Sequence, residues 1–164
     1  MILRGTRHTS PGFTLLEILL VTIILSILIS MVTVQFRRTF DNLQFKNFVL
    51  DLFTTLRYAH DKAILEKGTY LVRYTPNPPG YRLEQSTGMK VDGHVEYRRI
   101  KDRTGIFHPL PKNTQTQIDP QQIIFYPDGG ATEARWVFTD FKGHETTLRV
   151  HPEVGEATMD ESHG

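Results

Sequence analysis

The sequence predicts an α+β protein in which one long N-terminal helix, part transmembrane and part amphipathic, packs on an antiparallel β-sheet body. Three observations lead to this fold class. Phe13–Val34 is an almost uninterrupted apolar run. The stretch from Gln35 to Lys67 contains no glycine or proline and repeats apolar residues at helical spacing. After Gly68 the pattern changes to short strands separated by turn residues.

The apolar run is long enough to cross a membrane. As a helix it extends roughly 33 Å, against a hydrocarbon core of about 30 Å. Its only charged residue is Glu17. The insertion free energy of its Leu, Ile, Val and Phe side chains, about −5 to −8 kcal/mol, outweighs the roughly +3 kcal/mol of an acid at the helix centre. The run therefore predicts a single membrane-inserted helix over residues 13–34.

Residues 1–12 form a short polar segment in front of this helix. It contains Arg4 and Arg7 and no acid, and it ends in Ser-Pro-Gly directly before Phe13. The apolar run is too long for a secretory signal peptide, and no A-x-A cleavage pattern follows it. Because proline and glycine interrupt helix, we expect an open backbone at Gly12 that a protease can reach. The short leader favours a cytoplasmic N-terminus.

The stretch Gly12-Phe13-Thr14-Leu15-Leu16-Glu17 resembles the class III signal of type IV prepilins and of type II secretion pseudopilins. The resemblance implies that a prepilin peptidase cuts between Gly12 and Phe13 and then N-methylates Phe13. The competing interpretation is an ordinary signal anchor in which Glu17 is accidental.

Glu17 needs a partner, because burying an unpaired carboxylate in lipid costs free energy. After cleavage the α-amino group of Phe13 would be positive at neutral pH. Glu17 lies four residues further along, so it can meet the terminus of its own chain or that of an adjacent helix. The resemblance implies the adjacent helix, with the pair setting the register of filament assembly at some cost in stability. The residues alone leave both pairings open.

Residues 35–67 predict an amphipathic continuation of the helix, giving about 55 helical residues in all, with Gly68 as the C-terminal stop. Charged residues occupy the opposite face, so this half should lie against a globular body. A coiled coil is the alternative, but the heptad is too irregular. The expected apolar face consists of Phe36, Phe40, Leu43, Phe48, Leu52, Leu56, Ala59 and Ala63.

Residues 68–164 predict a β-rich domain of one or two antiparallel sheets resembling a β-sandwich. Residues 102–121 are rich in Pro, Thr, Gln and charge and predict an exposed loop, with at most a short strand at 106–107. Residues 135–139 and 146–150 should form a hairpin with Gly143 in its turn. The other expected strands are 69–74, 81–85, 95–100, 122–126 and an edge strand near 156–159.

The family resemblance extends into this domain. The matching residues are Leu56-Arg57, Ala63-Ile64, Lys67-Gly68, Ile124–Gly129, Thr147–Val150 and Gly155, which resemble the H-type minor pseudopilin (GspH/FimT) domain. The chain has no cysteine, whereas many pilins close a C-terminal loop with a disulfide. The resemblance therefore implies a minor pseudopilin more than a major pilin.

No catalytic or metal-binding pattern is present in the sequence, so no enzyme activity, metal or cofactor is expected. There is no G-x-S-x-G elbow and no P-loop. His60-Asp61 predicts a solvated pair, and Asp128-Gly129-Gly130 predicts a β-turn in which the glycines supply positive φ. The seven histidines lack metal-ligand spacing: His8, His60, His94, His108, His144, His151 and His163.

The only basic cluster consists of Arg98, Arg99, Lys101 and Arg103, interrupted by Asp102. A solvated strand face is the plain interpretation, and DNA capture is the functional one. The net charge of +1 and a C-terminal tail without Lys or Arg after residue 149 oppose nucleic-acid binding.

The resemblance, together with the apolar run, implies a minor pseudopilin of a bacterial type II secretion system, a single-pass inner-membrane protein with a periplasmic domain. Its expected partners are the prepilin peptidase, other pseudopilins or pilins in a filament, the inner membrane and secreted cargo proteins, and no nucleic acid. The first alternative is a FimT-like minor pilin of type IV pili, acting in pilus assembly or DNA uptake. The second, a membrane-anchored periplasmic enzyme or sensor, lacks a catalytic constellation. The expected segments are the leader peptide at residues 1–12, the transmembrane helix at 13–34, its amphipathic continuation at 35–67 and the periplasmic β-rich domain at 68–164.

Overall fold

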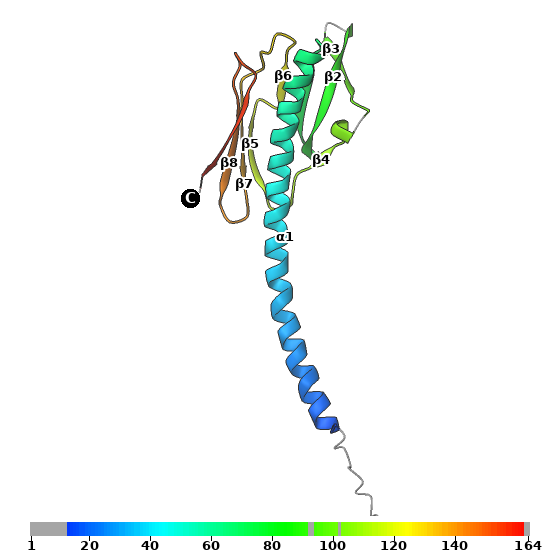
Figure 1. Ribbon diagram of the computed structural model, residues 1–164, viewed down its shortest axis with the longest axis vertical. Helices are drawn as coiled ribbons and strands as arrows, with labels where there is room; N and C mark the ends of the chain where they lie inside the picture. The colour runs from blue at the N-terminus through cyan, green and yellow to red at the C-terminus, as the bar shows by residue number, and fades with distance from the viewer. Residues whose placement is uncertain (1–12, 92–93, 102, 163–164) are drawn as a thin grey trace, which may run out of the picture. The chain divides into compact units, whose positions relative to one another are not determined.

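The computed structural model describes residues 13–91, 94–101 and 103–162, without the side chains of residues 31–40, 91 and 103 (Figure 1). The leader, including Gly12, lies outside these residues. The chain divides into two compact units, Met1–Phe40 and Asp41–Gly164, which we describe separately and call the N-terminal unit and the head. One α-helix, α1, runs from Leu15 to Leu65 and contributes to both units.

In the N-terminal unit α1 begins directly after Thr14, two residues later than the expected start at Phe13. Among the described residues, no helix is long and apolar enough to cross a membrane. The last four residues of the expected membrane segment, 31–34, lie outside the described side chains.

In the head α1 buries one face, as the apolar spacing predicts. Phe48, Leu52 and Leu56 on this face are all at most 8% exposed. Leu43 was expected there but is 53% exposed. Phe45 occupies the buried face instead. It lies two residues after Leu43, and side chains two residues apart on an α-helix point in almost opposite directions. The rest of the buried face consists of Val49, Ala59 and Ala63, whereas Phe36 and Phe40 lie outside the described side chains.

The C-terminal stop of α1 differs from the expectation. The helix ends at Leu65, and the left-handed residue is Lys67, with φ of 50°, instead of Gly68. The amide of Gly68 donates to the carbonyl of Ala63 at 3.2 Å. This bond across five residues is the signature of a Schellman motif, in which the left-handed residue precedes the donor.

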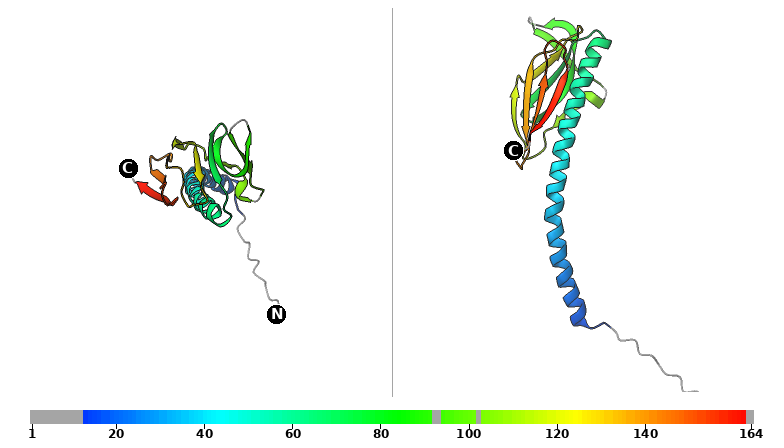
Figure 2. Two further views of the ribbon diagram at one scale, coloured as in Figure 1. Left: turned by 90° about the horizontal axis from the view of Figure 1, so that it is seen from above. Right: turned by 60° about the vertical axis from the view of Figure 1, so that its left-hand side comes forward.

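Within the described residues, nine strands form two antiparallel sheets (Figures 1 and 2). The first sheet has the order β3-β2-β1-β6, with β4 paired to β2, and the second has the order β5-β7-β8-β9. The first sheet contains β1 (Tyr70–Pro76), β2 (Pro79–Val91), β3 (His94–Arg99), β4 (His108–Pro109) and β6 (Gln122–Phe125). The second contains β5 (Gln115–Asp119), β7 (Ala134–Thr139), β8 (Glu145–Val150) and β9 (Ala157–Ser162).

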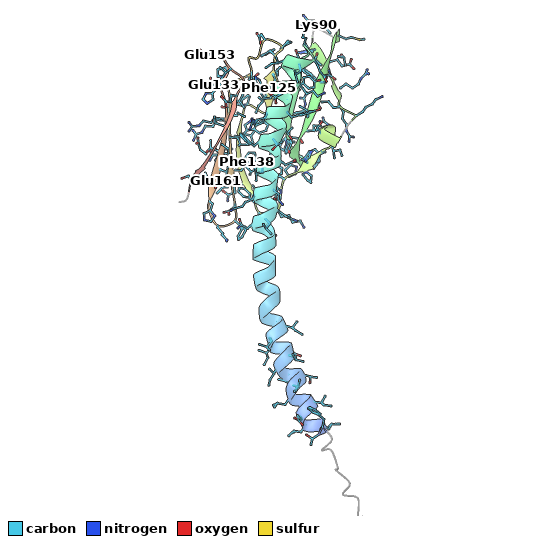
Figure 3. The ribbon with its side chains drawn as sticks, in the orientation of Figure 1. Lys90, Phe125, Glu133, Phe138, Glu153 and Glu161 are labelled. Carbon is cyan, nitrogen blue, oxygen red and sulfur yellow. The ribbon has the colours of Figure 1, made fainter. Side chains whose placement is uncertain are left out.

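The two sheets and α1 enclose one core. The inner faces of the strands contribute Tyr81, Phe125, Trp136 and Phe138, all fully buried, and Figure 3 labels Phe125 and Phe138 beside the helix. Where the sheets meet, the amide of Tyr74 donates to the carbonyl of Gln121 at 2.9 Å. The predicted α+β class, with a helix packed on antiparallel sheets, is confirmed.

The segment 102–121 is not only a loop, which corrects the sequence prediction. It contains a 3-10 turn, η1 (Arg103–Gly105), and strands β4 and β5. Pairing begins at His108, beyond the expected short strand at 106–107. Strand β5 was not predicted, because its residues are polar except for Ile118, which packs against the core.

Candidate assembly site

The first turn of α1 is fixed by a side-chain cap. Thr14 precedes the helix, and its Oγ1 accepts a hydrogen bond from the amide of Glu17 at 3.2 Å. The carbonyl of Thr14 also accepts from the amides of Glu17 and Ile18, at 3.1 and 3.2 Å. Free N–H groups at the start of the helix are thereby satisfied.

The sequence contains a signal for this cap, which was not among the predicted features. Thr14-x-x-Glu17 before an apolar run is the capping-box pattern, in which the acid can also bond back to the cap. Glu17 therefore has a third possible role, besides its two candidate pairings with a terminal amino group. The pattern was obscured because the same residues form the prepilin-like motif.

The following turns of α1 present an apolar surface. Phe13 and Leu16 are 75% and 77% exposed, and the large apolar residues from Ile18 to Ile29 are also exposed. The hydroxyl of Thr22 donates to the carbonyl of Leu19 at 2.9 Å, and that of Ser26 donates to the carbonyl of Thr22 at 2.7 Å. Such internal bonds leave fewer polar groups that need water, so this surface suits an apolar environment.

Of the predicted site residues, two are described. Phe13 lies just before α1, and Glu17 is exposed in its first turn. Gly12, the other side of the expected scissile bond, lies outside the described residues. Glu17 is the only charged residue between positions 13 and 36, so the site combines one carboxylate with an apolar helix surface.

His60, His108 and His144 each make a separate structural contact in the head. His108 Nδ1 lies 2.6 Å from Asp51, and His144 Nδ1 lies 3.1 Å from Asp140. The expected pair is present, with His60 Nδ1 3.6 Å from Asp61 Oδ1, but only Asp61 is exposed. His60 is half-buried instead of solvated, and its Nε2 lies 3.2 Å from the carbonyl of Gly129. Among the residues that the structure describes, no group of three or more His, Cys, Asp or Glu could hold a metal ion. His8 and His163 lie outside that part of the chain.

The basic cluster does not form one patch. Arg98 and Arg99 are consecutive in β3, so their side chains point to opposite faces of the sheet. Arg99 Nε donates to the carbonyl of Gly105 at 2.8 Å, which gives this arginine a structural contact. The side chain of Arg103 lies outside the described residues. This geometry agrees with the plain interpretation of a solvated strand.

The turn at Asp128–Gly130 has the predicted form, with one difference. Asp128 Oδ1 accepts from the amide of Gly130 at 3.0 Å, and Gly129 has φ of 91°. Gly130 was also expected at positive φ but does not have it. One left-handed residue is sufficient for this turn.

Comparisons with known proteins agree with these features. The pattern described as the prokaryotic N-terminal methylation motif matches residues 7–33, which include the capped start of α1. The chain is also 24% identical over 115 residues to a UPF0246 protein of Francisella philomiragia subsp. philomiragia, covering 64% of this chain and 45% of that protein. The chain therefore spans about half the length of this curated relative.

Two solved structures resemble the fold. The minor pseudopilin EpsH from the type 2 secretion system of Vibrio cholerae has a TM-score of 0.58 at 15% identity, covering 72% of this chain and 97% of EpsH. The type IV minor pilin FimU of Pseudomonas aeruginosa has a TM-score of 0.53 at 12% identity, covering 73% of this chain and 90% of FimU.

The motif and the fold together define a class of protein: a chain with a prokaryotic N-terminal methylation motif and a pilin-like fold. Within that class, its fold is the one shared by a minor pseudopilin and a minor pilin.

Proposed function

We propose that this chain is a minor filament subunit that is cut between Gly12 and Phe13, N-methylated at Phe13 and assembled through α1. The observation that carries this proposal is the methylation motif at residues 7–33, which from residue 15 onward lies on a capped helix with an exposed apolar surface. In the bacterial inner membrane that surface would face lipid, and in a filament it would face neighbouring helices. The role is structural, and no catalytic residue is assigned.

Glu17 is the proposed register residue. Within a bundle of apolar helices, the positive terminus of Phe13 needs a negative partner, and Glu17 is the only acid between positions 13 and 36. A pair between neighbouring chains would fix their axial offset, whereas a pair within one chain would only neutralise the terminus. We favour the pair between chains, because it explains why an acid is kept on an otherwise apolar helix.

The more specific proposal is the H-type minor pseudopilin of a type II secretion system, with its head in the periplasm. The likeness to EpsH supports it, as do the residues of the head that resemble this domain. Its partners would be the prepilin peptidase, other pseudopilins and secreted cargo. The likeness to FimU favours a second candidate, a minor pilin of type IV pili.

A gene deletion with complementation separates the two candidates. The secretion role predicts that deletion stops export of a folded protein across the outer membrane and leaves pili and DNA uptake intact. The pilus role predicts that deletion impairs pili or DNA uptake and leaves export of the folded protein intact. Complementation with Arg98→Ala and Arg99→Ala combined tests nucleic-acid binding, which we do not expect. Loss of DNA uptake in that variant, with export unchanged, would favour the pilin role.

A further inference from the structure

Strand β9 forms an edge of the second sheet that can accept another strand. It pairs with β8 alone. Just before β9, the amide of His151 donates to the carbonyl of Glu156 at 3.0 Å. The register continues from this bond without a bulge, so the alternation of an antiparallel ladder directs the backbone N–H and C=O groups of Met159 and Glu161 away from β8. Backbone groups of this kind are a template for a further strand.

A groove lies along the inner face of this edge. Strand β9 contributes Glu161 and Met159, which packs against the core, and α1 contributes Phe45, Val49 and Leu50. Leu50 is 52% exposed, so the groove has an apolar wall that the head itself does not cover. The volume of the groove is about 140 Å³. A cavity of roughly 150 Å³ holds one benzene molecule, so this groove suits one apolar side chain of an added strand.

The second sheet is the acidic part of the head. Residues 115–162 contain nine acids against three bases, whereas residues 70–101, which include most of the first sheet, contain six Lys or Arg against three acids. Within β9 the acids are Asp160 and Glu161, and both are exposed. In Figure 3, Glu161 lies on the side of the head formed by this sheet. The charge at this edge therefore favours a basic partner.

The acids beside the groove are available to a partner. Glu145 and Glu161 both line the groove and are exposed. Within the described part of the chain, neither belongs to an ion pair. Lys46 is the only lysine or arginine that lines the groove, so negative charge remains in excess there.

A second copy of this chain is a poor partner for the same edge. If two copies paired through β9, Asp160 and Glu161 of one copy would lie close to the same acids of the other. Like charges opposed across a pair of strands are destabilising, so this arrangement is disfavoured. The proposed role as a minor subunit also calls for contacts with other proteins.

We propose that β9 binds an extended basic segment of another protein as an additional strand of the second sheet. The backbone of this segment bonds to the free groups of Met159 and Glu161, and one of its apolar side chains enters the groove beside Leu50. Its Lys or Arg side chains lie next to Asp160 and Glu161. This inference goes beyond the proposed assembly through α1, because it assigns a partner to the head.

Peptide binding to the full-length chain in detergent micelles tests this site. The probe is a fluorescently labelled, amidated peptide, Lys-Thr-Leu-Thr-Leu-Lys-Thr-Lys, whose leucines share one face when it is extended. Fluorescence anisotropy should show saturable binding with a Kd below about 1 mM. The same peptide with glutamate in place of lysine should not bind. A version with every backbone nitrogen methylated keeps its charge but cannot donate hydrogen bonds, so it should bind roughly tenfold more weakly.

Variants of the chain then locate the site. Glu161→Lys should weaken binding of the basic peptide roughly tenfold, and Leu50→Ala roughly threefold. Glu133→Lys makes the same charge change at an exposed residue outside the groove. Leu43→Ala removes a leucine of α1 that is 53% exposed and also lies outside the groove. Each control should change the Kd by less than about twofold.

Hydrogen exchange separates strand addition from simple charge attraction. The basic peptide should slow amide exchange within residues 157–162, because the outward amides of Met159 and Glu161 gain partners. Unchanged exchange, equal binding of the acidic or methylated peptide, or equal effects of Glu161→Lys and Glu133→Lys would refute the inference. Chains that start at Phe13 but do not bind the basic peptide would refute it too, and would leave the proposed function standing.

Discussion

Asp140 shows how one carboxylate organises a turn of the head. It lies at the start of the β7–β8 connection, and only 1% of its side chain is exposed. Its Oδ1 accepts from the amides of Lys142 and His144, at 2.7 and 3.0 Å, and its Oδ2 lies 3.1 Å from His144 Nδ1. Burial alone raises the pKa of Asp140, but these hydrogen bonds outweigh it and hold the pKa below its ordinary value of 3.8.

Asp140→Asn should therefore lower the free energy of unfolding by about 1–3 kcal/mol at pH 7, because an amide cannot accept all three bonds. A carboxyl whose pKa is lowered by folding stabilises the head above its ordinary pKa and loses that contribution as pH falls through the lowered value. The difference between wild type and variant should thus shrink below about pH 4. Urea unfolding followed by fluorescence of the single tryptophan, Trp136, measures it.

The matched control is Asp160→Asn, an exposed aspartate without such hydrogen bonds. It should change the unfolding free energy by at most about 0.5 kcal/mol. An Asp140→Asn chain as stable as wild type at pH 7 would contradict the structural role assigned to this carboxylate.

Glu17 is the second residue with a specific prediction. Glu17→Val should leave cleavage and membrane insertion intact but reduce incorporation into filaments roughly a hundred- to a thousandfold, because an unpaired buried terminus costs roughly 3–5 kcal/mol. Glu17→Gln separates two roles, because glutamine can serve in a capping box but carries no charge. Co-purification with the other filament subunits measures incorporation.

If the charge is essential, both variants should fail to assemble. If Glu17 acts mainly as a capping residue, Glu17→Gln should assemble like wild type. Normal incorporation of Glu17→Val would show that neither role is needed.

At the scale of elements, the sequence predicted best where periodicity was strong. The long helix, the 135–150 hairpin and the strand near 122–126 are all present. Strand β5 was missed because its stability comes from pairing with β7 and from the Pro120–Trp136 contact, neither of which leaves a local pattern. The helix stop was misplaced by one residue, because the left-handed position went to a lysine. Tertiary contacts therefore determine β5, whereas the helix stop is a local difference between two neighbouring residues.

The candidate assembly site was likewise predictable from local residues only in part. The motif around Phe13 and Glu17 was recognisable from local residues alone, whereas the pairing partner of Glu17 depends on a second chain. The half-burial of His60 was not predictable, because it comes from a turn about 69 residues further along the chain.

The turn before β9 contains Gly155, which packs against His60 of α1. This contact gives a prediction at the scale of elements. Gly155 has φ of 62°, and a Cβ at this position would collide with the Gly129 carbonyl and the His60 ring. Gly155→Ala should therefore destabilise the head by roughly 2–4 kcal/mol, the sum of left-handed strain and overpacking. Thermal unfolding followed by Trp136 fluorescence measures the loss.

Gly143→Ala is its matched control, because Gly143 also has positive φ, 88°, but no atom lies within 4 Å of its missing Cβ. Strain alone predicts about 1–2 kcal/mol there. Equal losses in the two variants would mean that the Gly155 turn does not press on α1.

At the scale of the whole molecule, the charge separates into two regions even though the net charge is only +1. The separation follows the fold, with the β1–β3 region basic and the β7–β9 region acidic. The N-terminal motif supplies a means of joining chains, through α1.

The proposed assembly through α1 depends on removal of the leader, so the N-terminus of the mature protein is the most direct test. Mass spectrometry of the chain purified from membranes should show a protein that starts at Phe13 and carries a methyl group on its α-amino nitrogen. Gly12→Val should retain the leader, because a β-branched residue crowds an extended cleavage site. A wild-type chain that retains residues 1–12, or that starts anywhere other than Phe13, would contradict the proposed processing and assembly.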